Sequence, residues 1–343
     1  MIRQRPQSQR LQGQPRQRGV ALIIALVLVA LATILATKIT FDGYLERQRT
    51  IGILGAEQAL HFSLGAEALA ADGLMQSVQQ GGKQGAQVTL ADAWAQPIPP
   101  FPITPPNDAE GEPIGTVEGT LEDLQGRFNL NNLGRMVRNA TTQKFEPDPV
   151  PLAQFEQLLV SLGLETKWAQ MARDWIDPDS LPGGPDGAED SVYTALDPPY
   201  LTANFPMLSP TELMNLPGFG LERYRKIAPY VTALPISTKL NVCTAPVYVL
   251  ESLTKDLHGN FSTSPKVLTA NRKNGCFPDI KTLQNMMPPA DFAQIQGQII
   301  ESSDFFRLTT HVTLGTTQFT LYSLLQRGTG GKITPLLRSF GTL

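Results

Sequence analysis

A run of apolar residues near the N-terminus is the strongest pattern in the chain. It begins at Val20 and ends at Thr37, eighteen residues without a charge, a glycine or a proline. As a helix, this run would span about 27 Å at ~1.5 Å per residue, close to the ~30 Å hydrocarbon core of a bilayer. Arginines precede the run and only Lys38 follows it closely. We therefore expect the N-terminus in the cytoplasm and the rest of the chain on the other side of the membrane.

A secretory signal peptide has a similar charged start and apolar centre, and it is the alternative for this segment. Against that alternative, the helical pattern continues past the membrane towards Leu64. Gly52 and Gly55 weaken the continuation by ~1 kcal/mol each relative to alanine. We predict a single helix with a transmembrane part at 20–37 and an extension at 38–80.

Strand patterns lie at both ends of the remaining chain. Near the C-terminus, apolar and polar residues alternate from Phe306 to Leu314, which is the period of a half-buried strand. The strand pattern resumes at 319–325, and 332–338 is expected to form the last strand. Residues 115–133 predict a further strand with a turn around Gln125 and Gly126, whereas the Pro-rich residues 95–115 are expected to form a loop.

The stretch between these strands is mainly helical in pattern and is interrupted by proline and glycine. Strand signals on both sides of a helical stretch imply an insertion. We predict an α+β fold in which the long N-terminal helix packs on a small antiparallel sheet. Residues 81–133 and 301–343 would supply this α/β core, and a helical domain at 134–300 would be inserted between its strands.

The charges are unevenly distributed. Residues 1–19 hold five arginines and no acidic residue, and the rest of the chain has 23 basic and 31 acidic side chains, a net charge of −8. An acidic body is poorly suited to non-specific nucleic-acid binding, which depends on neutralising phosphates. Two cysteines and three histidines are too few for a multi-cysteine zinc site.

Catalytic motifs are not found in the sequence. His61, His258 and His311 lie in three separate segments without metal-ligand spacing. There is no Gly-x-Ser-x-Gly elbow, P-loop or dinucleotide fingerprint. We do not expect an enzyme.

One segment suggests a rival function. Residues 209–220, followed by Tyr224 and Ile227, resemble a helix-hairpin-helix, whose glycines contact phosphates in nucleic-acid proteins. The rival hypothesis is therefore a membrane-anchored DNA-binding or uptake protein. The alternative is a compact packing unit within a helical domain, which agrees with the few basic residues nearby.

The residues before the apolar run resemble a type IV prepilin-like leader. Gln17-Arg18-Gly19 precedes Val20, and the resemblance implies cleavage after Gly19 by the prepilin peptidase and methylation of the new N-terminal Val20. The usual pattern has Phe at the first mature position and Glu at the fifth. Here these positions are Val20 and Ile24, and the missing Glu is characteristic of one member of the family, the K component.

Together with the predicted architecture, several internal motifs make the chain similar to the K minor pseudopilins of type II secretion systems over nearly its whole length. These motifs are Asp123–Asn131, Asp174–Asp179, the residues from Asn204 to Leu213, and Leu240–Ala245. The resemblance implies a subunit of the bacterial inner membrane with a periplasmic head. It would cap the pseudopilus tip with minor pseudopilins I and J, contact the other pseudopilins and support protein export.

The most acidic loop of the chain extends from Asp174 to Asp190. Calcium takes six to eight oxygen ligands, which Asp-, Gly- and Pro-rich loops supply well. Composition alone favours a solvated acidic loop with capping aspartates. The resemblance favours Ca²⁺ because family members are similar in binding calcium in the helical domain. The ligands chosen on this basis are Asp177, Asp179, Asp186, Glu189 and Asp190, whereas Asp174 is read as a helix residue.

Cys243 and Cys276 lie 33 residues apart in the part of the chain expected in the periplasm. A disulfide persists there, and closing such a loop would contribute ~3–4 kcal/mol to stability. The alternative is two separately buried thiols. The family pattern has Asn at the position of Cys243, so a bridge would be a local addition.

Overall fold

The computed structural model describes residues 18–80, 87–96, 99–105, 111–139, 141–253 and 265–341. Most of the predicted leader and His258 lie outside these residues, whereas Gly19 and Val20 lie in the first turn of helix α1, Arg18–Gln80. Contacts divide the chain into two compact units, one ending at Gln58 and one beginning at Ala59.

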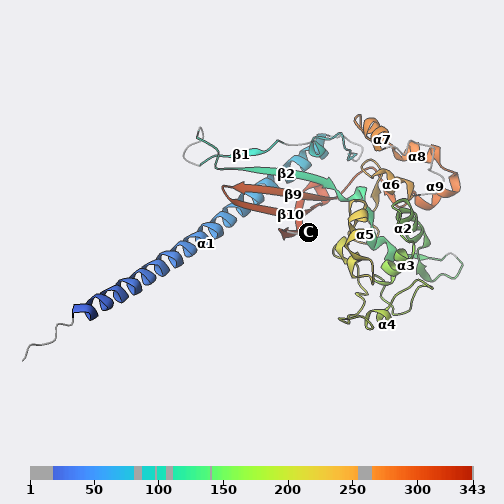
Figure 1. Cartoon of the computed structure of the whole chain (residues 1–343). Helices are drawn as coiled ribbons and strands as arrows, with labels where there is room; N and C mark the ends of the chain where they lie inside the picture. Colours follow the sequence, from blue (N-terminus) through green and yellow to red (C-terminus); the bar gives the residue numbers. More distant parts are fainter. Residues whose placement is uncertain are drawn as a thin grey trace, which may run out of the picture. The chain divides into compact units, whose positions relative to one another are not determined.

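The second unit combines one main sheet with a group of short helices (Figure 1). The described helices after α1 are α2 Pro149–Ser161, α3 Lys167–Asp174, α4 Asp190–Tyr193, α5 Gly220–Ile227, α6 Val247–Glu251, α7 Pro265–Arg272, α8 Ile280–Met286 and α9 Pro289–Ile295. The described strands are β1 Phe101–Ile103, β2 Gly115–Asp123, β3 Phe128–Asn129, β4 Met136–Arg138, β5 Phe145–Pro147, β6 Val231–Thr232, β7 Leu240–Asn241, β8 Ile299–Ile300, β9 Phe305–Leu314, β10 Thr317–Arg327 and β11 Ile333–Phe340.

The main sheet has five antiparallel strands in the order β1-β2-β9-β10-β11. Strands β2 and β9, far apart in sequence, pair along their whole length, from Gly115 opposite Leu314 to Asp123 opposite Phe306. The chain between them forms the helical domain, and the predicted α+β fold is confirmed. Strand β1 lies in the segment expected to be a loop. Its Pro102 cannot donate a ladder hydrogen bond, but this is tolerated because β1 is the edge strand.

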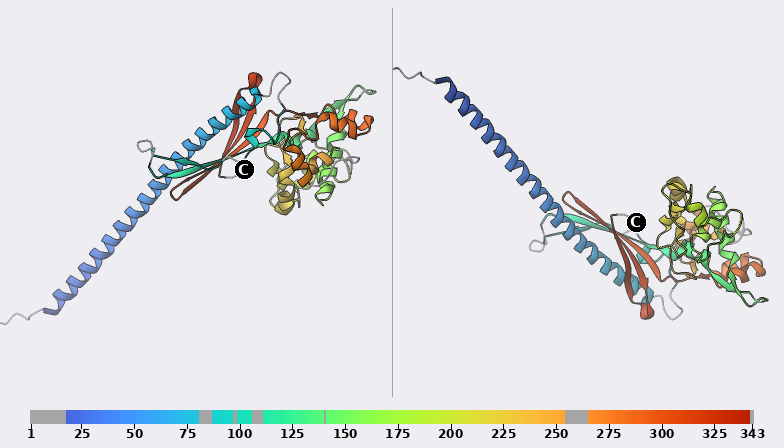
Figure 2. Two further views of the ribbon diagram at one scale, coloured as in Figure 1. Left: turned by 90° about the horizontal axis from the view of Figure 1, so that it is seen from above. Right: turned by 90° about the horizontal axis from the view of Figure 1, so that it is seen from below.

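The last part of α1, from Ala59 onward, packs on one face of this sheet (Figure 2). Ala59 contacts the cluster around Val312, and Leu74 packs with Phe306 and Leu325. The inward residues of β9 that the alternation predicted are those that meet the helix. This packing joins the helix to the α/β core.

A charged contact lies inside the apolar helix–sheet interface. Glu67 of α1 is buried and accepts hydrogen bonds from Arg338 Nε at 2.9 Å, from Arg338 Nη2 at 2.7 Å and from Ser323 Oγ at 2.6 Å. Burial acts to raise the pKa of Glu67, but the hydrogen bonds and charge of Arg338 and the Ser323 bond outweigh it, so this pKa is lowered. The ionised carboxylate is therefore the form that the fold stabilises.

We predict a pH-dependent contribution from Glu67. A carboxylate whose pKa is lower in the folded than in the unfolded state stabilises above the unfolded value of about 4.5, and this stabilisation disappears as the pH falls below it. Glu67→Gln should remove about 2 kcal/mol at pH 7 and much less at pH 3, because one partner of a buried pair is lost. Urea unfolding at both pH values measures this. An equal loss at both would contradict the prediction, and the exposed Glu118→Gln serves as the control.

The helical domain has its own core. Its buried residues come from α2, α3, α6 and the loop before α5, and include Phe155, Leu158, Trp168, Phe219 and Leu250. Trp168 meets Phe219 edge-on, with ring centroids 5.3 Å apart. The domain is therefore a packed unit that can hold loops in place on its surface.

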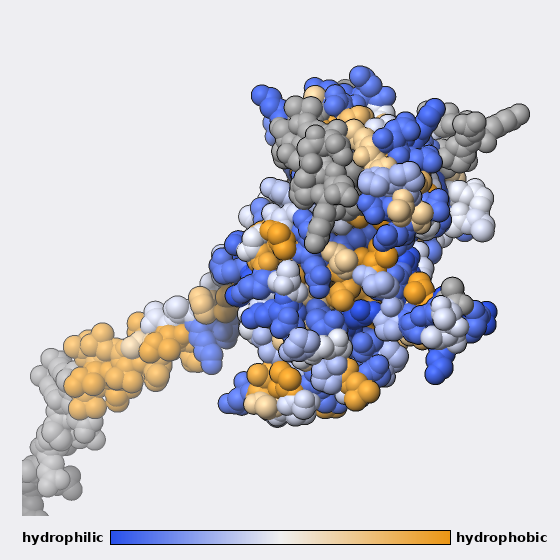
Figure 3. Space-filling view, turned by 90° about the vertical axis from the view of Figure 1, so that its right-hand side faces the viewer, coloured by the Kyte–Doolittle hydropathy of each residue, from blue (hydrophilic) through white to orange (hydrophobic). Residues whose placement is uncertain are grey.

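In the first unit, the large apolar side chains of α1 from Val20 to Leu35 are exposed at successive positions around the helix, and Figure 3 shows one apolar face of it. It is long and apolar enough to cross a membrane, and the apolar window has no buried residue. Gly52 and Gly55 do not interrupt the helix. An all-round apolar helical surface is typical of a segment solvated by lipid.

Candidate functional site

Three acidic side chains come together on the loop between α3 and α4. One ligand oxygen from each of Asp177, Asp179 and Glu189 lies within 4.8 Å of the others. Glu189 directly precedes α4, and Asp177 follows α3 closely. The loop therefore returns on itself and places the two ends of an acidic segment beside each other.

Asp174, the last residue of α3, makes this return possible. Its carboxylate is buried and accepts hydrogen bonds from the backbone N–H of Gly183 at 3.2 Å and of Ala188 at 2.9 Å, and from Gln170 Nε2 at 2.6 Å. A Cβ at residue 187 would lie 2.4 Å from Asp174 Oδ2, so the close approach requires glycine there. Reading Asp174 as a helix residue alone missed this role. The feature of the sequence that could have indicated this role is an aspartate followed by a glycine-rich loop.

Two of the clustered carboxylate oxygens lack hydrogen-bond partners. Asp177 Oδ1 and Glu189 Oε1 are inaccessible to water and have no hydrogen-bond partner among the described residues. Burial and the nearby charges of Asp179 and Asp174 raise the pKa of Asp177 to about 7. Burial and the charges of Asp177, Asp174 and Asp179 raise the pKa of Glu189 to about 7 as well. The fold thus holds carboxylates together at a cost that a bound cation would relieve.

The other two predicted ligands lie outside this cluster. Asp190 begins α4, and its Oδ1 accepts hydrogen bonds from Thr202 N–H at 3.0 Å and Thr202 Oγ1 at 2.6 Å. Asp186 is exposed near the tip of the loop. The Asp190 carboxylate is thus held by Thr202, whose hydroxyl also lies 3.5 Å from Glu189 Oε2, and it is not one of the three converging carboxylates.

The donor set suits a hard divalent cation. Three carboxylates offer up to six oxygens, and Ca²⁺ requires about six to eight, the remainder coming from backbone carbonyls or water. The two orphaned oxygens are the atoms that such an ion would satisfy. Among the described residues, the group contains no His or Cys, which argues against zinc.

A disulfide joins Cys243 to Cys276, with their Cα atoms 4.5 Å apart. Arg272, buried beside it, donates from Nε to Phe277 O at 2.6 Å and from Nη2 to Val242 O at 2.9 Å. The guanidinium therefore bridges the residues adjoining the two cysteines. Together the bridge and Arg272 attach the segment after α7 to the loop after β7.

We predict that Cys243→Ser with Cys276→Ser lowers the free energy of unfolding by about 3–4 kcal/mol, because an open loop gains entropy in the unfolded chain. Denaturant unfolding of the double variant measures the loss. Wild-type protein treated with a thiol reductant should show the same loss, and the variant should not respond to reductant. If reductant also lowers the stability of the double variant, the loss does not come from this disulfide.

A polar junction connects the helical domain to the sheet. Asp123, at the end of β2, accepts hydrogen bonds from Gln125 N–H at 2.8 Å, Asn241 Nδ2 at 3.0 Å, Thr244 Oγ1 at 2.6 Å and Ser303 Oγ at 2.6 Å. Gln125 and Ser303 lie near the two ends of the inserted domain, and Asn241 and Thr244 lie inside it. Asp123 therefore fixes where the insertion leaves and rejoins the sheet.

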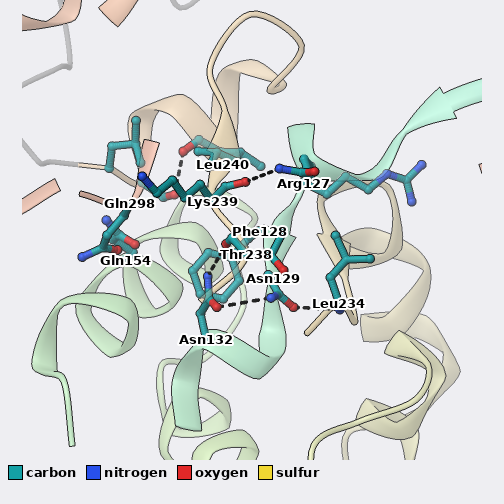
Figure 4. A pocket seen from close by; sticks show the side chains of 14 residues that line it. Arg127, Phe128, Asn129, Asn132, Gln154, Leu234, Thr238, Lys239, Leu240 and Gln298 are labelled. Atoms are coloured by element: carbon teal, nitrogen blue, oxygen red, sulfur yellow. Dashed lines mark hydrogen bonds between the residues drawn. The ribbon is translucent and has the colours of Figure 1, made fainter. Parts of the chain in front are cut away.

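The asparagines after Asp123 extend this junction (Figure 4). Asn129 Nδ2 donates to Asn132 Oδ1 at 3.2 Å, and Asn132 Nδ2 donates to Thr238 O at 3.0 Å. Asn131 Nδ2 donates to Leu234 O at 2.9 Å, and its Oδ1 accepts from Met207 N–H at 2.7 Å. Side-chain amides thus satisfy the backbone of loops that lack regular pairing.

The hairpin of the rival hypothesis packs into the core of the helical domain. Leu213, Leu216 and Phe219 are buried there, and Gly218 has a positive φ of 82°. Arg223, near the hairpin, pairs with Glu165 through Nη2 at 3.1 Å. The glycine-containing turn serves packing, and comparisons with known proteins give no support to the DNA-binding alternative.

A membrane-length apolar helix that continues onto an antiparallel sheet, with a helical domain inserted between β2 and β9, defines a subunit of the pilin-like class. The family model for type II secretion system protein K matches residues 126–236. Type II secretion system protein K of Pseudomonas aeruginosa is 33% identical over 95% of this chain and 93% of its own length. The protein K of Pectobacterium carotovorum subsp. carotovorum is 32% identical over 95% of this chain and 97% of its own.

Among solved structures, the crystal structure of the GspK–GspI–GspJ complex from enterotoxigenic Escherichia coli matches with a TM-score of 0.70 at 25% identity, covering 86% of this chain and all of that one. The chain belongs to the type II secretion system protein K family, the minor pseudopilins, which are structural components of a secretion machine.

Proposed function

We propose that this chain caps the tip of a periplasmic pseudopilus together with minor pseudopilins I and J, and thereby supports protein export across the outer membrane. The observation that carries the proposal is the bulky helical domain between β2 and β9. Such a domain would obstruct the repeated packing of subunits within a uniform filament. The neighbour with the same fold was crystallised as a complex with GspI and GspJ, which supports the choice of partners.

The missing Glu supports the same position. A Glu at the fifth mature residue would meet the N-terminal amine of a neighbouring subunit, and here that residue is Ile24. A tip subunit has no neighbour above it to pair with. Ile24 therefore suits the tip better than the shaft.

The location of the intact chain along purified pseudopili tests this proposal. Gold-labelled antibody against the helical domain should mark one end of each fibre. A variant without residues 134–300 is expected to be less restricted to that end, because the steric obstacle is gone. An even distribution of the intact chain along the fibre would refute a tip position.

The membrane helix is proposed to anchor the chain in the inner membrane, with a cytoplasmic N-terminus and a periplasmic head, until assembly. We further propose that the prepilin peptidase cuts after Gly19 and that Val20 is then methylated. The mass of the mature N-terminal peptide tests both steps: Val20 with one methyl group is expected, and Gly19→Leu should retain the leader. A mature start beyond residue 37 would identify a secreted protein instead.

Calcium is proposed as the structural cofactor of the head, held by Asp177, Asp179 and Glu189. The ion would neutralise these carboxylates and order the loop between α3 and α4. The proposal is supported by the unpartnered oxygens and raised pKa values described above.

We propose that the chain is a structural part without catalytic activity and without nucleic-acid affinity. The acidic body outside residues 1–19 disfavours phosphate binding. A gel shift with duplex DNA at physiological salt tests this point, and a shifted band would revive the helix-hairpin-helix alternative.

A further inference from the structure

We propose that the outer loops of the helical domain, residues 177–208, form a docking surface for a basic segment of another protein that carries apolar side chains. We call this region the loop surface. The inference goes beyond the proposed position at the pseudopilus tip, which rests on the bulk of the helical domain and on Ile24, and it would fail or succeed independently of that position.

The first observation is an unusual distribution of charge. Between Arg173 and Arg223 the chain has nine acidic residues and no Lys, Arg or His. Within the loop surface, Asp179, Asp186 and Asp197 are exposed. Six of the nine lie in the loop surface itself, and one bound divalent cation would reduce their formal charge only from −6 to −4. The loop surface therefore remains strongly negative whether or not the acidic cluster holds an ion.

The second observation is the exposure of large apolar side chains among these charges. Leu201, Phe205 and Leu208 are 61%, 63% and 83% exposed, all within one stretch of eight residues. Leu181, in the acidic loop itself, is exposed as well. Apolar patches lie among hydrophilic ones at the lower end of the helical domain, where Figure 1 places α4 (Figure 3). Exposed apolar groups rimmed by charge are typical of protein interaction sites.

The third observation is that the loop surface is held in a fixed shape. Thr202, buried between the exposed residues, is attached to Asp190 by two hydrogen bonds. Met207 N–H donates to Asn131 Oδ1 at 2.7 Å, and Leu208 N–H donates to Glu212 Oε1 at 2.6 Å. The frame of the stretch is anchored while its apolar side chains point to solvent. Because this stretch is already ordered, binding a partner would cost little additional conformational entropy.

Charge complementarity selects the occupant. Anionic lipid surfaces and nucleic acids would be repelled by the six acidic residues of the loop surface, and so would the same surface of a second copy. A protein segment rich in Lys or Arg would be attracted, and its apolar residues could cover Leu201, Phe205 and Leu208. The inferred binding partner is therefore a basic amphipathic segment of another protein.

The experiment uses the full chain in zwitterionic nanodiscs with saturating Ca²⁺ and a fluorescent peptide of alternating leucine and lysine. Fluorescence anisotropy should show binding that weakens as salt rises from about 50 to about 300 mM, because the Debye length shortens. The triple variant Leu201→Ser, Phe205→Ser, Leu208→Ser should bind about tenfold or more weakly. The matched control Leu336→Ser, Leu337→Ser removes exposed apolar groups from β11 and should bind as wild type.

A second variant separates charge from folding. Asp186→Asn with Asp197→Asn changes two exposed carboxylates outside the acidic cluster, and it should flatten the salt dependence and weaken binding several-fold. The proposal is overturned if wild type and triple variant bind the peptide equally. It is overturned equally if a leucine–glutamate peptide or phosphatidylserine vesicles bind as tightly as the leucine–lysine peptide.

Discussion

Asp123→Ala is expected to lower the free energy of unfolding of the second unit by about 4–5 kcal/mol, among the largest effects that a single substitution produces. The carboxylate accepts four hydrogen bonds in a buried site. Ser303 Oγ and the Gln125 N–H have no other acceptor described, so their desolvation would go uncompensated. Urea unfolding followed by tryptophan fluorescence measures the loss.

The exposed Glu118 lies on the same strand and provides a matched control, because Glu118→Ala removes a carboxylate without breaking a buried network. Its effect should stay within about 0.5 kcal/mol. The stability loss of Asp123→Asn should lie between those of Asp123→Ala and Glu118→Ala. The amide oxygen of Asn can still accept hydrogen bonds, but its amide nitrogen would face other donors. A loss below about 1 kcal/mol for Asp123→Ala would show that the junction does not depend on this residue.

The sequence predicted the α+β fold because its main signals are local. The period of two in β9 and the apolar run in α1 each follow from one continuous segment. Strand β1 escaped prediction because its pairing with β2, through Pro102 opposite Thr116, depends on tertiary position and not on propensity. The role of Asp123 escaped for the same reason, since its partners Asn241 and Ser303 are distant in sequence.

The candidate site could be located from the sequence but not resolved into its members. Composition identified the loop, yet which carboxylates converge depends on how the chain returns through Gly183 and Gly187. Asp174 controls that return, although it is seen in sequence only as the end of a helix. Asp190, at the start of α4, instead accepts a hydrogen bond from Thr202, and the spacing of acidic residues in the sequence does not predict this contact. The ligand set itself stays a prediction.

Removal of calcium is expected to have an effect comparable to that of Asp123→Ala. A ligand that binds only the folded state stabilises it by about 4 kcal/mol at 1,000 times its dissociation constant. Chelation should therefore lower the melting temperature of the head by several degrees, and added Ca²⁺ should restore it. Differential scanning calorimetry of the wild-type chain with and without chelator measures this shift.

The pH dependence of the metal-free protein gives an independent check. For Asp177 and Glu189 the folded pKa, about 7, exceeds the unfolded value near 4, so the folded state binds more protons. Stability in chelator should therefore fall as the pH rises from about 4 to about 7, and saturating Ca²⁺ should remove most of this fall.

Variants of the loop decide which carboxylates are involved. Asp177→Asn with Glu189→Gln should melt higher than wild type in chelator, because the repulsion between carboxylates is relieved, and should not respond to Ca²⁺. Asp186→Asn, which changes an exposed carboxylate of the same loop, should keep the full response if the ion sits among Asp177, Asp179 and Glu189. Loss of the response in Asp186→Asn would instead restore Asp186 as a ligand. A wild-type melting temperature that chelator leaves unchanged would exclude a structural cation. In that case the surrounding fold alone must offset the repulsion between the clustered carboxylates.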